Sequence, residues 1–309
     1  MSWTLRPILV IASGLVLALP VPLSAQRRPL SGRVVLSPTF ETGRGRLHWS
    51  IGPGAGVVRS VLHFDGLSHR EVRLAGRAVV MQTSHGAWLL AGSVAAGSLA
   101  GGRMLDTDFE QGVESRQSVA AVTGRRSQSW TGALGWCRPV SCSAGEDALT
   151  LWAGWAARKE DIRIQNGTQL LPDSTGMAGL DSRYEAVWAG PWIAGEATVG
   201  LPRSTLLARL TLHPLTRFRS RGRWNLRYDL AQPLSFAQWD AGWGWALDAR
   251  YGYRMSERLR FTIGVRRSVM VAKDGRDIAY AANGDAYGSQ LIEARWDDTT
   301  LSFGVGVSF

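Results

Sequence analysis

The last ten residues alternate strictly between bulky apolar and small or polar side chains. Leu301, Phe303, Val305, Val307 and Phe309 have one parity, and serines and glycines have the other. Successive side chains of a strand point to opposite faces, so one face here is apolar and the other is small and polar. Strands with lipid on one side and a polar lumen on the other have this pattern. The chain is therefore predicted to be a transmembrane β-barrel.

Residues 238–253 repeat the alternation over a longer span. Trp239 and Trp243 share one parity, whereas Asp248 and Arg250 have the other. A soluble β-sandwich would place those charges in its apolar core, while a barrel lumen can pair them with each other. The pattern therefore favours a barrel over the sandwich.

Ten segments have strand character, an even number as in most outer-membrane barrels. They are 33–50, 57–83, 86–100, 117–137, 147–163, 179–198, 203–219, 231–254, 257–273 and 289–309. Longer links are expected at 101–116, 164–178, 219–230 and 274–288, alternating with short turns. Several segments exceed the roughly 9–11 residues that cross a bilayer. We therefore predict an all-β, ten-stranded antiparallel barrel whose strands extend beyond the membrane on the extracellular side.

The N-terminus has the features of a secretory signal peptide. Arg6 precedes an apolar run at 8–19, and Ala25 offers a small residue for cleavage. We predict a signal peptide at 1–25 and a barrel at 26–309. The alternative is an uncleaved anchor helix, for which the apolar run is short. Export argues against nucleic acid as the partner of the net charge of +10.

The two cysteines predict a small disulfide loop. Cys137 and Cys142 are five positions apart, with Pro139 between them. Exported proteins form disulfides, and neither cysteine has a neighbouring histidine that would indicate a metal site. No metal site is predicted elsewhere in the chain.

Asp106 and Asp108 are the strongest candidates for chemistry. Their i, i+2 spacing directs both carboxylates to one side of an extended backbone. Two close carboxylates raise the pKa of one of them, which suits general-base work on a water molecule. The alternative is an acidic pair on a solvated loop.

The segment around these aspartates resembles omptins, the ten-stranded outer-membrane aspartate proteases. Residues 101–109, GGRMLDTDF, are similar to the family's Gly-Gly-x-Met-x-Asp-x-Asp-aromatic segment. Gly135-Trp136, Ala153-Gly154-Trp155 and the last two hairpins, about 231–309, also resemble the family. The resemblance covers the mature chain and implies a bacterial outer-membrane barrel.

The second half of the omptin site does not match. The resemblance implies an Asp–His pair beyond the seventh strand, near 219–228, and that stretch has neither residue. His48 or His213 is the alternative base. The family's acidic specificity pocket is also missing, because Arg46 and an arginine-rich stretch occupy the corresponding positions. We therefore expect a half-site without peptidase activity, with an active omptin-type endopeptidase as the alternative.

The resemblance also implies a bound lipid. Omptins bind lipopolysaccharide through outward basic side chains, and Lys159 and Arg183 lie at matching positions, although Ala157 replaces a family glutamate. Arg219, Arg221 and Arg223 alternate along one face. We expect a monomeric barrel without cofactors that binds an anionic envelope or surface ligand at an arginine-rich mouth. The third candidate function is a passive channel for small solutes.

Overall fold

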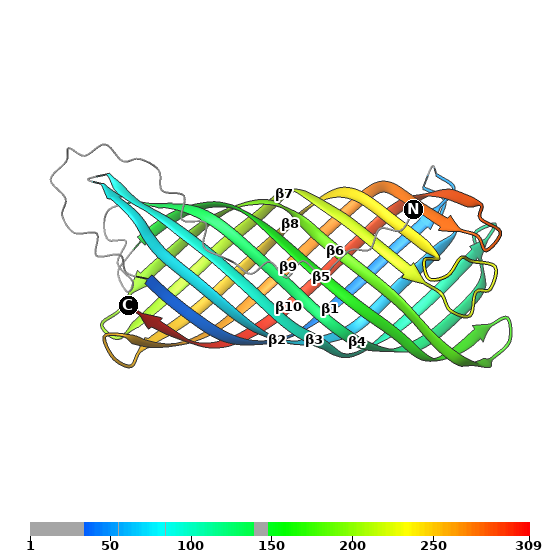
Figure 1. The fold of residues 1–309 in the computed structure, drawn as a ribbon, viewed down its shortest axis with the longest axis horizontal. Coiled ribbons are helices and arrows are strands. Elements are labelled where there is room, and N and C mark those ends of the chain that lie inside the picture. The colour runs from blue at the N-terminus through cyan, green and yellow to red at the C-terminus, as the bar shows by residue number, and fades with distance from the viewer. Residues whose placement is uncertain (1–33, 55, 84, 139–147) are drawn as a thin grey trace. The chain divides into compact units, whose positions relative to one another are not determined.

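A computed structural model describes residues 34–54, 56–83, 85–138 and 148–309. Ten antiparallel strands form one closed barrel in which chain neighbours pair and β1 pairs with β10 (Figure 1). The strands are β1 (Val34–Gly52), β2 (Ser60–Thr83), β3 (Gly86–Glu110), β4 (Val113–Cys137), β5 (Ala148–Leu171), β6 (Thr175–Gly200), β7 (Ser204–Arg223), β8 (Phe236–Arg254), β9 (Leu259–Tyr280) and β10 (Ala286–Ser308). The predicted ten-stranded fold is confirmed. Within the described ranges, no helix is long and apolar enough to cross a membrane.

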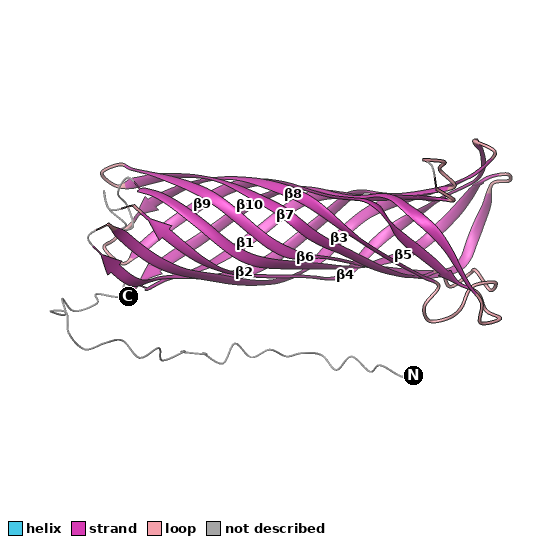
Figure 2. Cartoon of the chain, turned by 90° about the horizontal axis from the view of Figure 1, so that it is seen from above, coloured by secondary structure: helices cyan, strands magenta, loops and turns pink. Residues whose placement is uncertain are grey.

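The barrel has two ends, which we call the terminal end and the mouth end. The terminal end holds the start of β1 and the end of β10, and the mouth end holds the links that follow the odd-numbered strands (Figure 2). Closure leaves every described strand paired on both sides, so the barrel has no free sheet edge.

Three of the four expected long links are mostly strand. The expected link 101–116 is a hairpin in which only residues 111–112 separate β3 from β4, and 164–178 and 274–288 are likewise largely paired. Backbone groups make the ladder bonds, so polar side chains beyond the membrane do not end a strand. Only the link at 224–235 is long at the mouth end. Strands of 19–26 residues extend past the apolar region, as predicted.

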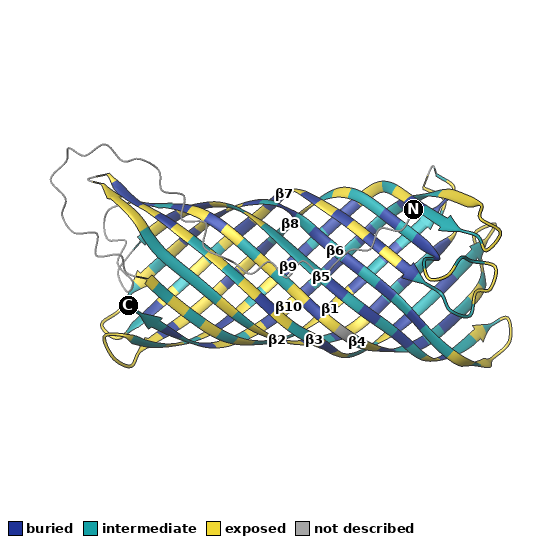
Figure 3. Cartoon of the chain, viewed as in Figure 1, coloured by how far each residue is buried: buried dark blue, intermediate teal, exposed yellow. Residues whose placement is uncertain are grey.

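The outer face carries the apolar band that the alternation predicts. On β10, Leu301 and Phe303 are exposed to the outside, while Thr300 and Gly304 are buried in the lumen (Figure 3). Trp243 on β8 is also exposed. This arrangement matches the lipid-facing surface of a transmembrane barrel.

The lumen of the mouth half is closed by aromatic side chains. The rings of Trp49 on β1 and Tyr184 on β6 stack with centroids 6.5 Å apart, although these strands are opposite in the ring order. Phe64 and Phe236 contact the same tyrosine ring at 5.5 and 6.0 Å. Aromatic residues are therefore not confined to the lipid-facing surface. In this region they fill the narrow interior of a ten-stranded barrel.

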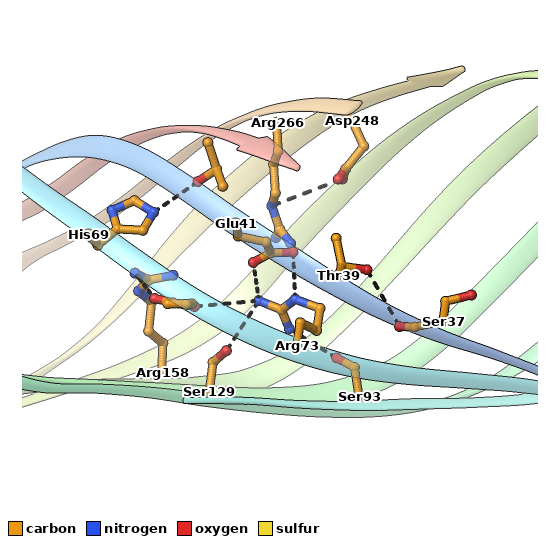
Figure 4. Close-up of polar contacts among 12 residues, drawn as sticks. Ser37, Thr39, Glu41, His69, Arg73, Ser93, Ser129, Arg158, Asp248 and Arg266 are labelled. Atoms are coloured by element: carbon orange, nitrogen blue, oxygen red, sulfur yellow. Dashed lines mark hydrogen bonds and ion pairs between the residues drawn. The ribbon is translucent and has the colours of Figure 1, made fainter. Parts of the chain in front are cut away.

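A buried polar layer, which we call the central layer, crosses the lumen on the terminal-end side of the aromatic contacts. It comprises Glu41, His69, Glu71, Arg73, Ser127, Arg158, Glu160, Asp298 and Thr300, which are linked by hydrogen bonds and ion pairs. Figure 4 shows Arg73 among Glu41, Ser93 and Ser129. The Arg158 guanidinium lies 5.3 Å from the Trp296 ring on the opposite strand.

Two sequence predictions concern residues outside the described ranges. The signal peptide at 1–25 lies there, and so does Cys142. Cys137 is buried as the last residue of β4. The disulfide between the two cysteines stays a prediction.

Candidate functional site

The aspartate pair faces the lumen because β3 changes phase at Gly101–Gly102. Leu99 and Met104 belong to the same buried interior cluster although their parities differ. The register between β2 and β3 shifts opposite these glycines. After the shift the even positions point inward, which brings Asp106 and Asp108 to the lumen near the mouth end. The prediction that both carboxylates share one side is confirmed, but they lie on a strand and not in a loop.

Asp106 is held in an environment that favours its protonated form. The pKa of Asp106 is raised to about 7 by burial and by the negative charge of Asp108. The positive charges of Arg227 and Arg116 and a hydrogen bond with Ser60 act in the opposite direction. The carboxyl group therefore titrates near neutral pH, as a general base for water requires.

Arg227, from the link 224–235, supplies positive charge to the aspartate pair. Its charge interacts with both Asp106 and Asp108. It also forms a two-point ion pair with Asp229, with Nε–Oδ1 and Nη2–Oδ2 distances of 2.9 and 2.7 Å. This is the region in which the omptin resemblance implies an Asp–His pair. A guanidinium keeps its protons at all physiological pH values, so it stabilises carboxylates but accepts no proton.

Neither alternative histidine acts on the aspartate pair. His48 lies on the outward face of β1, where its Nε2 is 2.9 Å from Glu293 Oε1. His213 is buried in the lumen on β7, and the charged group that acts on it is Arg266. The charges that act on Asp106 include no histidine. The structure therefore does not bring the predicted bases to the predicted carboxylates.

The arginines of β7 are on the outer wall and not inside the mouth, contrary to the prediction. Phe218 and Ser220 are buried in the lumen, so Arg217, Arg219 and Arg221 project outward between them. Arg46 also faces outward, with its Nε 3.7 Å from Asp65 Oδ1. A side chain faces inward or outward according to whether its position is odd or even. On β7 the inward parity changes at a register shift between His213 and Thr216.

Six outward basic residues of β5, β6 and β7 form one surface, which we call the basic wall. It consists of Lys159, Arg183, Arg217, Arg219, Arg221 and Arg223. Lys159 forms an ion pair with Glu185, and Arg223 donates a hydrogen bond to Gln232. Among the described residues, Arg217, Arg219 and Arg221 have no carboxylate within ion-pair distance. Sequence reasoning identified these residues, except Arg217 as a site residue, and expected Lys159 and Arg183 to face outward. It did not predict the outward face of the β7 arginines.

The pKa of Asp106 gives a direct test of this geometry. A folded-state pKa of about 7, above the ordinary value of 3.8, means that the wild-type protein loses stability as pH rises from about 4 to 7. Asp106→Asn mimics the protonated form, so we expect this variant to be more stable than wild type by about 4 kcal/mol at pH 8 and by less than about 1 kcal/mol at pH 4. Denaturant unfolding in micelles at both pH values measures the difference.

Asp173→Asn is the matched control, because Asp173 is exposed in the link at 172–174. Its effect should be the same at both pH values. An Asp106→Asn variant whose advantage over wild type does not grow with pH would contradict the description of Asp106.

Three comparisons bear on the identity of the chain. A family model described as "Pom: Protochlamydia outer membrane protein" matches residues 44–309. No curated protein matches the sequence.

Within the described residues, no group of three or more His, Cys, Asp or Glu side chains is arranged to hold a metal ion.

Solved structures resemble the barrel at low sequence identity. The outer membrane protease OmpT of Escherichia coli matches with a TM-score of 0.75 and 12% identity, covering 91% of this chain and 99% of OmpT. The toluene transporter TodX of Pseudomonas putida matches with a TM-score of 0.36 and 9% identity over 91% and 89% of the two chains. The translocator domain of NalP from Neisseria meningitidis gives 0.34 and 13% over 90% and 89%. The first match shows an omptin-like fold.

Proposed function

This chain belongs to the Protochlamydia outer membrane protein family, and we propose that it is a catalytically inactive, omptin-like barrel that binds an anionic envelope ligand. It resides in the bacterial outer membrane. The ligand-binding surface is the basic wall. The observation that supports binding is the row Arg217, Arg219 and Arg221, three neighbouring guanidinium groups without carboxylate partners.

The position of the basic wall favours phosphates at the membrane surface. On β7 the exposed apolar residues end at Leu215, and Arg217 is the next outward side chain after it. Small or apolar neighbours, Ala189 and Ala241, pair with Arg217 across the sheet and do not compete for its charge. Arginine binds phosphate oxygens through two parallel hydrogen bonds. Lipopolysaccharide carries such phosphates, and Lys159 and Arg183 extend the same surface.

Binding can be measured with lipopolysaccharide and the refolded barrel. Relative to wild type, we expect the triple variant Arg217→Gln, Arg219→Gln, Arg221→Gln to bind at least tenfold more weakly, because each phosphate loses a charge-assisted hydrogen bond of about 1.5–3 kcal/mol. A control that removes the same charge, Arg203→Gln, Arg254→Gln, Arg258→Gln, changes exposed residues near the terminal-end turns. Equal losses in both variants would refute the basic wall as the binding surface.

The absence of peptidase activity is supported by Arg227. Its permanent positive charge acts on both Asp106 and Asp108, and it cannot accept a proton from a water molecule bound at the aspartate pair. The omptin-type endopeptidase is the competing proposal, in which Asp106 and Asp108 activate water. It retains the support of a carboxyl group that titrates near pH 7.

Peptide hydrolysis separates these two proposals. We expect the barrel, refolded with lipopolysaccharide and offered dibasic and acidic peptides, to release no product above the rate of a sample without protein. Turnover that Asp106→Ala abolishes would establish an active endopeptidase instead. A contaminating protease would be unaffected by that substitution.

A further inference from the structure

Four lumen-facing arginines near the terminal end form ion pairs with buried carboxylates, and neither the omptin-type site nor the basic wall involves them. They are Arg77, Arg209, Arg250 and Arg266, and with Glu196 and Asp248 they form what we call the basic layer. The arginines lie within seven residues of the terminal ends of β2, β7, β8 and β9. Four guanidinium groups share two carboxylates, so the layer has two positive charges in excess.

The two carboxylates are buried and each is shared. Glu196 accepts from Arg77 at 2.8 Å and is 2.5 Å from Arg209 Nη2. Asp248 is bound much more loosely, with Arg250 Nη2 at 3.4 Å and Arg266 Nε at 4.0 Å. The guanidinium groups of Arg250 and Arg266 therefore retain most of their hydrogen-bonding capacity.

Solvent reaches these arginines although they point into the barrel. The side chains of Arg250 and Arg266 are 48% and 39% exposed, whereas Glu71 and Glu160 of the central layer are 0% and 1% exposed. Small residues line this part of the lumen. A Cβ at Gly264 would lie 2.8 Å from Arg250 Cγ, so glycine gives the arginine side chain its place.

Arg209 adds an independent indication of a missing acceptor. Its Nε is buried and has no hydrogen-bond partner among the described residues. Buried N–H groups without an acceptor are rare in proteins and cost free energy. An anion oxygen or a water molecule in the basic layer would satisfy this donor.

The sign of the charge changes along the lumen. The central layer, farther from the terminal end, has four carboxylates, Glu41, Glu71, Glu160 and Asp298, against two arginines. Figure 4 shows Arg266 and Asp248 beside the Glu41–Arg73 pair, where the two layers adjoin. An anion that enters from the terminal end therefore meets the excess positive charge first and is stopped by the negative layer behind it.

We propose that the basic layer is a binding site for a small phosphate-bearing anion that enters the lumen from the terminal end. Arg250 and Arg266 are its main ligands, since their ion pairs with Asp248 are long and solvent reaches them. Arginine pairs chelate phosphate oxygens with geometric specificity. The site is separate from the basic wall, which lies on the outer face near the other end of the strands.

Inorganic phosphate is the probe. Titration calorimetry and phosphorus NMR of the full barrel in lipopolysaccharide-free micelles, at fixed sodium chloride, should give one bound phosphate per chain. The double variant Arg250→Gln, Arg266→Gln should weaken binding at least tenfold. Arg250→Gln alone should weaken it severalfold, and this variant should fold like wild type because the ion pair that it removes is long.

Arg267→Gln is the matched control, because Arg267 is the next residue of β9 but points outward and pairs with Asp297. It should change phosphate affinity less than twofold, and so should the triple variant of the basic wall. No binding by wild type, or an equal loss in Arg267→Gln, would overturn the proposal. A loss confined to the basic-wall variant would place phosphate on that wall and refute the lumen site, whatever the result with lipopolysaccharide.

Discussion

Replacing Arg158 by alanine is expected to lower the free energy of unfolding by about 3–5 kcal/mol, the usual cost of removing one partner of a buried ion pair. Arg158 Nη2 is 2.9 Å from Glu71 Oε1, and Arg158 Nε is 2.6 Å from Glu160 Oε1. Both carboxylates are almost fully buried, so water cannot replace the guanidinium. The variant also loses the contact with Trp296 across the lumen. Urea unfolding in micelles, followed by the gel mobility of the folded barrel, measures the change.

A second variant, Glu160→Gln, tests whether both carboxylates that bind Arg158 are ionised. Ser127 Oγ is 2.7 Å from Glu71 Oε1 and 2.8 Å from Glu160 Oε1. A hydroxyl group has one hydrogen, so it can donate to only one of these carboxylates. The other carboxyl oxygen lies at hydrogen-bond distance from the Ser127 oxygen with no hydrogen between them, unless that carboxyl group is protonated and donates to Ser127. An amide at position 160 is neutral and supplies such a donor.

We therefore expect Glu160→Gln alone to change stability by less than about 1 kcal/mol. In the Arg158→Ala background it should restore part of the loss, because one buried charge disappears. If Glu160→Gln is as damaging as Arg158→Ala, both carboxylates are ionised and the central layer depends on two complete ion pairs. If the double variant shows no recovery, the loss comes from packing against Trp296.

The sequence was sufficient for the number and order of strands but not for their ends. Alternation in 238–253 and 300–309 is nearly unbroken, so the last hairpins are predictable from period 2 alone. The segment 101–116 contains glycines and charges and was therefore expected to be a loop. Its pairing with β2 and β4 depends on backbone bonds to strands far away in the chain, which local composition does not encode.

The second feature that the sequence did not determine is the face of the sheet on which each side chain lies. A register shift at Gly101–Gly102 turns Asp106 inward, and the shift between His213 and Thr216 turns Arg217 outward. One slipped residue moves every later side chain to the other face. Asp106 and Asp108 were predictable because their spacing survives such a slip. The face of the β7 arginines was not predictable, and Arg219, Arg221 and Arg223 were therefore assigned to the mouth.

Arg227 was missed for a related reason. The segment Arg227-Tyr228-Asp229 has no catalytic signature, and its importance arises only from charges on β3 and β4 that the closed barrel brings to it. The signal present in the sequence was the lack of Asp and His at 219–228 together with the adjacent Asp229. That signal indicates what the site lacks, but not which group replaces it.

Planar-bilayer recordings of the wild-type barrel are expected to give no stable conductance steps. Trp49 and Tyr184 meet across the lumen, and Arg158 and Trp296 meet across it in the central layer. Steady ohmic steps from the wild-type protein would support the passive-channel reading and would show that these contacts open in the membrane.

The variant Tyr184→Ala tests the aromatic contacts that close the lumen, through the free energy of unfolding of the barrel. Tyr184 is fully buried and contacts three aromatic rings, so the substitution should cost about 3–5 kcal/mol of unfolding free energy. Tyr184→Phe is the control and removes only the hydroxyl group, which bonds Gln238 and Ser220, at a cost of about 1 kcal/mol. The alanine variant should still not conduct, because the Arg158–Trp296 contact remains. If it conducts while Tyr184→Phe does not, the aromatic contacts alone close the barrel, and the central layer serves stability without blocking ions.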